Sequence, residues 1–138
     1  KAIQEYARVT KQWGFVIDIN FFYHTKPPAE LLRKLNNLLG ITIQPWGLNY
    51  WKNLYKVCEL EQFYISTDKV RLVKKNEIIN YCHVMAHEKK YSTEVESSIT
   101  ERLCETMSLF NENHKYLSYG IFINRKRPFP EQISLFDQ

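Results

Sequence analysis

The sequence FVIDINFFY, from Phe15 to Tyr23, decides the fold of this chain. Its odd-numbered positions are all apolar or aromatic, whereas its even-numbered positions include Asp18 and Asn20. A period of two is typical of a β-strand with one apolar side and one mixed side. We therefore predict a central strand whose odd-numbered side, including Ile17 and Ile19, packs in the core.

Helical patterns precede and follow this strand. Apolar residues recur at helical spacing over residues 2–13, before Gly14. After the strand, Pro27 and Pro28 are placed where a helix tolerates a missing N–H group. The second helix has an apolar stripe, and we expect this stripe to pack on the odd-numbered side of the strand. Its members are Leu31, Leu32, Leu35, Leu38 and Leu39.

The remaining patterns predict further strands and helices. We expect a short strand over 41–46, a helix over 48–58 and a two-stranded hairpin over 63–73. Two more helices begin near 76 and 93, and a last strand covers 116–123. This order predicts an α+β (mixed α/β) fold with about four or five strands and about five helices packed on the sheet. We place a single globular domain at 1–124 and a proline-containing tail at 125–138.

Composition sets limits on the class of protein. The 138 residues are 44% hydrophobic and carry a net charge of +4, which suits one packed domain and permits anionic partners. No apolar run is long enough to cross a membrane, so we expect no membrane partner. Cys58, Cys82 and Cys104 lack metal-site or disulfide spacing, and we predict a cytoplasmic protein. The chain opens on Lys1, which is compatible with the C-terminal part of a longer polypeptide.

The tail carries a short linear pattern. Gln132, Ser134, Leu135 and Phe136 form Gln-x-Ser-Leu-Phe, which resembles the pentapeptide by which bacterial replication and repair proteins dock on the DNA sliding clamp. The resemblance implies that the glutamine occupies a polar subsite and that the Leu-Phe pair fills an apolar pocket of the partner. We therefore expect the sliding clamp or another protein to bind this tail. The alternative is a strap packed on the chain's own domain.

Basic residues gather along the predicted hairpin and at the start of the tail. Tyrosines interleave with them, as is typical of surfaces that track a phosphate backbone. Lysines on an exposed edge strand that prevent aggregation are an equal alternative. The predicted nucleic-acid-binding residues are Lys69, Arg71, Lys74, Lys75, Arg125, Lys126 and Arg127.

Two sets of residues are candidates for metal chemistry. Asp68, Glu88 and Lys90 have a spacing compatible with restriction-type nucleases, in which carboxylates hold Mg²⁺, although the chain around Glu88 reads as helix. His83 and His87 lie four residues apart on a helix and could reach one metal ion. Valine stands where the zinc-protease pattern requires a glutamate. We expect no cofactor unless the nuclease alternative holds, in which case Mg²⁺ is required.

Asp18 and His24 share the even-numbered side of the first strand. They are about 20 Å apart in an extended strand, which excludes a direct acid–base pair. We predict that this side faces solvent or a groove, and the alternative is that Asp18 is paired inside the protein. Neither a glycine-rich phosphate loop nor a nucleophile motif occurs, which argues against a nucleotide-driven enzyme.

These patterns favour an accessory protein of DNA replication or repair, bacterial or from a phage. It would dock on the sliding clamp through its tail and contact DNA through the basic surface, without catalytic activity of its own. One alternative is a metal-dependent nuclease that uses Asp68, Glu88 and Lys90. Another is a regulatory interaction module of phage or plasmid type.

Overall fold

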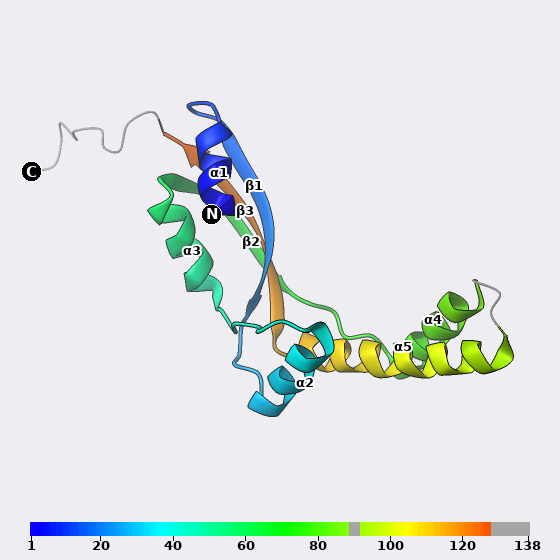
Figure 1. Cartoon of the computed structure of the whole chain (residues 1–138). Helices are drawn as coiled ribbons and strands as arrows, with labels where there is room; N and C mark the ends of the chain where they lie inside the picture. Colours follow the sequence, from blue (N-terminus) through cyan, green and yellow to red (C-terminus); the bar gives the residue numbers. More distant parts are fainter. Residues whose placement is uncertain (89–91, 128–138) are drawn as a thin grey trace, which may run out of the picture. The chain divides into compact units, whose positions relative to one another are not determined.

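A computed structural model describes residues 1–88 and 92–127 of the chain (Figure 1). The described residues form an α+β fold of five helices and one three-stranded sheet, which confirms the predicted fold class. None of the described helices is long and apolar enough to span a lipid bilayer. The elements in chain order are α1 (Ala2–Val9), β1 (Phe15–Tyr23), α2 (Ala29–Leu39), α3 (Leu48–Val57), β2 (Leu60–Lys69), α4 (Lys75–His87), α5 (Thr93–His114) and β3 (Leu117–Lys126).

The sheet has the strand order β1-β3-β2, so β1 is an edge strand and the prediction of a central strand is wrong. Backbone hydrogen bonds show that β1 pairs antiparallel to β3. Trp13 N–H donates to Lys126 O over 2.7 Å at one end, and His24 N–H donates to Tyr116 O over 3.0 Å at the other. The sheet has three strands rather than four or five because residues 41–46 form no strand and the predicted hairpin is the single strand β2.

The two sides of β1 are reversed relative to the prediction. Ile17 and Ile19, on the apolar odd-numbered side, expose 67% and 62% of their surface, whereas Val16 and Phe22 on the mixed side are buried. The mixed side is covered because α1 and α3 pack on it. The alternation therefore located the strand correctly but assigned its buried side wrongly.

The chain forms two compact units. Among the described residues, unit 1 contains Lys1–Phe22, Trp46–Asp68 and 119–127, and unit 2 contains Tyr23–Pro45, 69–88 and 92–118. Unit 1 therefore holds α1, α3 and most of the sheet, while unit 2 holds α2, α4 and α5.

The core of unit 1 lies between the sheet and helices α1 and α3. Phe122, in the middle of β3, is fully buried, and its ring centroid lies 5.2 Å from that of Tyr55 on α3. Gly120 makes room for the Phe122 ring, because a Cβ atom at residue 120 would lie 2.7 Å from the ring atom Cε2. Ile3 of α1 and Leu60 of β2 complete the buried cluster with Val16.

Asp18 is half-buried and paired within unit 1, which corresponds to the stated alternative of an internal partner. The Tyr55 hydroxyl donates to Asp18 Oδ2 over 2.9 Å, and Asn20 Nδ2 donates to the same oxygen over 2.8 Å. Burial and then the Asp18 carboxylate raise the pKa of Tyr55, so its hydroxyl stays protonated and remains a donor. This hydrogen-bonded group explains how polar residues of β1 can face the protein interior.

Unit 2 is built around a helical hairpin. Helices α4 and α5 run side by side in opposite directions (Figure 1), and Ile78, Cys82 and Ala86 form the buried side of α4. Helix α2 also packs on α5, with Leu31 and Leu35 buried. The expectation that this leucine stripe covers the odd-numbered side of β1 is therefore wrong.

Candidate functional site

A cluster of polar side chains lies in unit 2, where β1 ends and β3 begins. His24 Nδ1 lies 2.9 Å from Ser118 Oγ, and the Tyr23 hydroxyl donates to Asn113 Oδ1 over 3.1 Å. We call these four residues the His24 cluster. It joins parts of the chain that are about ninety residues apart in sequence.

Local chemistry explains why these four residues meet. The strand β1 cannot continue past residue 26, because Pro27 and Pro28 lack the N–H groups that a sheet requires. The bond from His24 N–H to Tyr116 O sets the register of the two strands at this end. It makes Ser118 a diagonal neighbour of His24 on the same face, within reach of the imidazole ring.

The cluster combines buried and accessible groups. Ser118 and Asn113 are buried, whereas His24 is exposed. Burial raises the pKa of Tyr23, and the hydrogen bond to Asn113 partly opposes that rise, so the hydroxyl stays protonated and remains a hydrogen-bond donor. A serine hydroxyl can either donate or accept, so Ser118 holds the His24 ring in either tautomer. A histidine ring held through Nδ1 keeps a second nitrogen, Nε2, that can donate or accept a hydrogen bond.

The sequence placed His24 on the first strand but did not reveal its neighbours. Asp18, on the same side of that strand, was excluded as an acid–base partner of His24, and it bonds to Tyr55 and Asn20 in unit 1. A usable signal was present in the two prolines, because they mark the end of the strand. Asn113 and Ser118 carry no local pattern, and only the antiparallel pairing of β1 and β3 brings them to His24.

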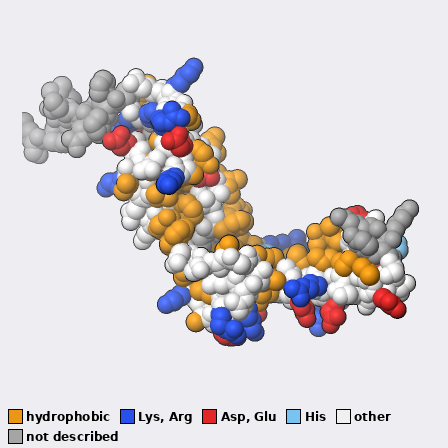
Figure 2. Space-filling view, viewed as in Figure 1, with side chains coloured by type: hydrophobic (Ala, Val, Ile, Leu, Met, Phe, Trp, Pro, Cys, Tyr) orange, Lys and Arg blue, Asp and Glu red, His pale blue; other side chains and the backbone are white. Residues whose placement is uncertain are grey.

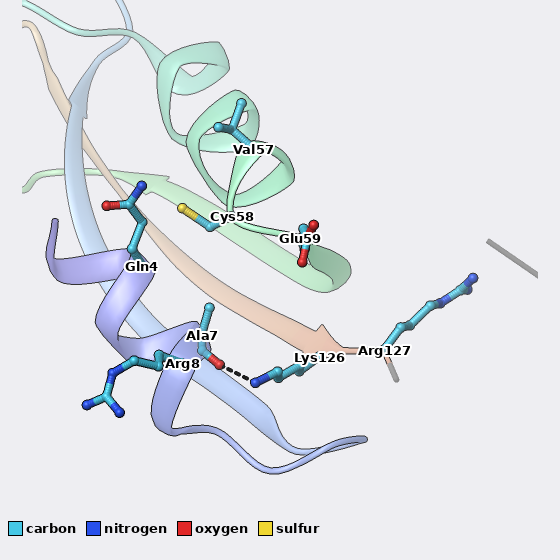
Figure 3. A pocket seen from close by; sticks show the side chains of 8 residues that line it. All are labelled: Gln4, Ala7, Arg8, Val57, Cys58, Glu59, Lys126 and Arg127. Carbon is cyan, nitrogen blue, oxygen red and sulfur yellow. Dashed lines mark hydrogen bonds between the residues drawn. The ribbon is translucent and has the colours of Figure 1, made fainter. Parts of the chain in front are cut away.

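The basic residues at the end of β3 are bound within the chain. Arg125 Nη2 lies 2.8 Å from Glu61 Oε2, and Arg127 pairs with the other oxygen of the same carboxylate. Lys126 Nζ donates to Ala7 O over 2.7 Å and to Thr10 O over 3.0 Å, at the C-terminal end of α1 (Figure 3). These contacts satisfy the hydrogen-bonding capacity of carbonyl groups and of one carboxylate in unit 1. The three cations therefore stabilise the fold of unit 1.

The other predicted nucleic-acid-binding residues lie on separate elements. Lys69 ends β2, Lys74 caps α4, Lys75 begins α4, and Arg71 pairs with Glu77 over 3.7 Å. Because residues 63–73 do not form a hairpin, the alternating basic face that we predicted there does not exist.

The ion pair of Glu61 gives a pH-dependent prediction. The hydrogen bonds from Arg127 and Arg125 lower the pKa of Glu61 to about 2. A lowered pKa stabilises the folded chain above the ordinary pKa of 4.5, and this contribution is lost as the pH falls towards 2. Glu61→Gln should therefore lower the melting temperature at pH 7, and its difference from the wild type should shrink between pH 5 and pH 2.

Thermal unfolding followed by circular dichroism at pH 7, 5, 3 and 2 measures this effect. Glu59→Gln is the matched control, because Glu59 is an exposed carboxylate two residues away that does not pair with either arginine. A Glu61→Gln difference that stays constant down to pH 2 would contradict the assigned ion pair.

The candidates for metal chemistry do not form a metal site in the part of the chain that the structure describes. Asp68 lies on β2, Glu88 follows α4, and Lys90 falls outside the described residues. Within residues 1–88 and 92–127, no group of three or more His, Cys, Asp or Glu side chains could hold a metal ion. His83 and His87 are exposed on α4. The predicted tail motif, Gln132 to Phe136, also lies outside the described residues.

Two adjacent hollows lie between α1 and α3 in unit 1. The larger, of about 360 Å³, contains Asp18 and Asn20, whose polar atoms bond to Tyr55 and to each other. The smaller, of about 270 Å³, is lined by Arg8 and Lys126, and the Lys126 amine is bound to the end of α1 (Figure 3). These polar groups of the two hollows therefore already bind one another or the end of α1.

Comparison with known proteins identifies the fold. No protein-family model matches the chain, and no curated protein matches it. Among solved structures, MccD is similar over 91% of this chain, with a TM-score of 0.79 and 18% identity. A protein assigned as a sarcosine dimethylglycine methyltransferase from Galdieria sulphuraria is similar over 91% of the chain, with a TM-score of 0.58 and 15% identity. Phosphoethanolamine N-methyltransferase 2 from Haemonchus contortus is similar over the same share, with a TM-score of 0.56 and 12% identity.

The chain spans only part of these neighbours. It covers 53% of the MccD chain, 46% of the Galdieria sulphuraria protein and 29% of the Haemonchus contortus enzyme. The likeness shows that this chain shares its fold with part of each of these proteins. The prediction of an accessory replication or repair protein is therefore wrong, and so are its nuclease and regulatory-module alternatives.

Proposed function

We propose that the chain is one part of an S-adenosylmethionine-dependent methyltransferase and that it carries the residues that bind and activate the methyl acceptor. The observation that carries this proposal is the match of 91% of the chain to MccD and to two methyltransferases. The Haemonchus contortus enzyme has been solved in complex with S-adenosylmethionine. The His24 cluster supplies chemistry that suits the acceptor side of such a reaction.

The described residues do not by themselves fit S-adenosylmethionine. In α/β proteins, a nucleotide-like cofactor is held where a glycine-rich turn joins a strand to a helix, because backbone N–H groups must approach it closely. The turn from β1 to α2 instead contains Pro27 and Pro28, and the turn from β2 to α4 contains no glycine. We infer that residues outside this chain bind the cofactor, in agreement with the partial coverage of the solved neighbours.

A small amine is the acceptor that we propose. The Galdieria sulphuraria protein is assigned as a sarcosine dimethylglycine methyltransferase. The Haemonchus contortus enzyme has been solved in complex with phosphomonomethylethanolamine. An ammonium group must lose a proton before it can act as a nucleophile. The His24 Nε2 atom accepts that proton, while Ser118 holds the ring through Nδ1.

We further propose that this reaction takes place in the cytoplasm. Cys58, Cys82 and Cys104 are free thiols. Burial and then the neighbouring Cys104 thiol raise the pKa of Cys82 to about 11, so Cys82 stays protonated and unreactive. Free cysteines of this kind suit a reducing compartment.

Binding of the cofactor tests the proposed function. The product of the natural gene, with any polypeptide joined or tightly bound to it, is purified under mild conditions and mixed with radiolabelled S-adenosylmethionine. We expect one molecule of cofactor per chain in equilibrium dialysis and no binding by the 138-residue chain alone. If the natural product binds no S-adenosylmethionine, the proposed function is wrong.

A further inference from the structure

An exposed apolar surface covers one face of the sheet in unit 1. Its residues on β1 expose about half or more of their surface, and Phe63 of β2 is similarly exposed. Residues of β3 lie between them and are half-buried. We call this surface the odd face; its members are Phe15, Ile17, Ile19, Phe21, Phe63, Tyr119, Ile121 and Ile123.

The odd face has the composition of an interior. An antiparallel sheet that meets water on one side normally carries polar residues at alternate positions of that side. On β1 these positions are Phe15, Ile17, Ile19 and Phe21, without a polar residue among them. In Figure 2, hydrophobic side chains gather along the edge of unit 1 where β1 runs in Figure 1. A contiguous apolar patch of this kind marks a surface that another polypeptide covers.

The free edge of β1 adds a second feature to the same surface. Because the sheet order is β1-β3-β2, the edge of β1 that points away from β3 has no strand beside it among the described residues. A long apolar edge strand readily pairs with another strand, and isolated proteins usually protect such an edge with charges or prolines. The segment from Phe15 to Tyr23 contains no lysine, arginine or proline, and its one charged residue, Asp18, is bound by Tyr55 and Asn20 on the side away from the odd face.

One end of the odd face has the polar rim of an interface. The Arg125 guanidinium lies 5.1 Å from the Trp13 ring and 5.8 Å from the Phe63 ring, while Glu61 binds the same arginine. The rings of Phe15 and Phe63 meet edge to face at 5.0 Å. Aromatic residues with a paired arginine beside them are typical of protein interfaces.

We infer that the odd face and the free edge of β1 bind the complementary part of the methyltransferase-type domain. This occupant places an apolar layer on the odd face and a strand beside β1. We expect the occupant to be about as large as this chain, because 91% of this chain matches only 53% of the MccD chain. The identity of the occupant rests on the proposed function, whereas the existence of the interface rests on the surface alone.

Site-specific photo-crosslinking tests this inference. Ile19 is replaced by p-benzoylphenylalanine in the natural gene, and crosslinked peptides are identified by mass spectrometry after irradiation. Val57 on α3, which is 77% exposed, is the control position, because it is an equally accessible apolar residue of unit 1 outside the odd face. We expect position 19 to crosslink at least ten times more strongly than position 57, to peptides that lie outside residues 1–138.

Each other outcome contradicts the inference. Crosslinks from position 19 to a second copy of residues 1–138 would mean that the odd face forms a self-association surface. No crosslink above the level of position 57 would mean that the face is not covered. Cofactor binding without crosslinking would reject only the interface, and crosslinking without cofactor binding would reject only the proposed function.

A variant of the isolated chain shows whether Ile17 and Ile19 lie on an exposed surface or in the chain's own core. Ile17→Lys with Ile19→Lys should lower the fluorescence of the apolar dye ANS several-fold and shift the melting temperature by less than a few degrees. Val57→Lys should leave the dye signal unchanged. A loss of folded structure in the double variant would mean that these side chains belong to the chain's own core, and the inference would then be wrong.

Discussion

Replacing Phe122 by alanine should lower the free energy of unfolding by about 3–5 kcal/mol, the largest stability effect that we expect in this chain. Phe122 is fully buried in the middle of β3, and its ring lies against Tyr55. Removing the ring leaves a cavity between the sheet and α3, because Gly120 beside it has no side chain that could fill the space. Urea denaturation followed by circular dichroism measures the change.

Phe21→Ala is the matched control for this prediction. Phe21 is also a phenylalanine of the sheet, but it lies on the odd face and exposes 61% of its surface. Its removal from the isolated chain should change the free energy of unfolding by about 1 kcal/mol or less. If Phe21→Ala lowers the free energy of unfolding as much as Phe122→Ala does, the covered and open faces of the sheet have been assigned wrongly.

Replacing His24 by alanine should slow methyl transfer by about 10²–10⁴-fold, the range that a general base contributes. The variant should still bind S-adenosylmethionine, because the residues that hold the cofactor lie outside the His24 cluster in this account. Transfer of a radiolabelled methyl group to the acceptor is measured at saturating cofactor. The loss should fall on kcat, because the proton is removed after the acceptor has bound.

Two further variants keep this prediction specific. His87→Ala is the control, because His87 is an exposed histidine on α4, and the rate should stay within about twofold of the wild type. Ser118→Ala removes the partner of the His24 Nδ1 atom and should cause a smaller loss than His24→Ala. A His24→Ala enzyme with an unchanged kcat would exclude His24 as the proton acceptor.

The elements were largely predictable from the sequence, whereas the layers were not. The period of two over Phe15–Tyr23 and the leucine spacing after Pro28 both correspond to real elements. Periodicity distinguishes two faces of a strand but does not reveal which face this chain covers. Asp18 and Asn20 marked the mixed side as solvated, and only the distant Tyr55 hydroxyl makes its burial possible. The apolar side is open because this chain supplies no layer for it among the described residues.

The candidate site was predictable only in part, for a related reason. The sequence placed His24 on the first strand, which in the structure ends at Tyr23, but the cluster around it was not predicted. Its partners come from the end of α5 and the start of β3, and the sheet register brings them together. The positions of the basic residues in the sequence did not reveal that Glu61 and the end of α1 bind three of them.

Methyl transfer by the natural gene product tests the central claim most directly. The purified product is incubated with S-adenosylmethionine labelled on its methyl group and with the small-amine fraction of the same cells. Label is then counted in the amines after chromatography. We expect label in one amine, which appears only with active protein and is lost in the His24→Ala variant. Cofactor that stays bound without any label reaching a small molecule would mean that the protein is not a small-amine methyltransferase.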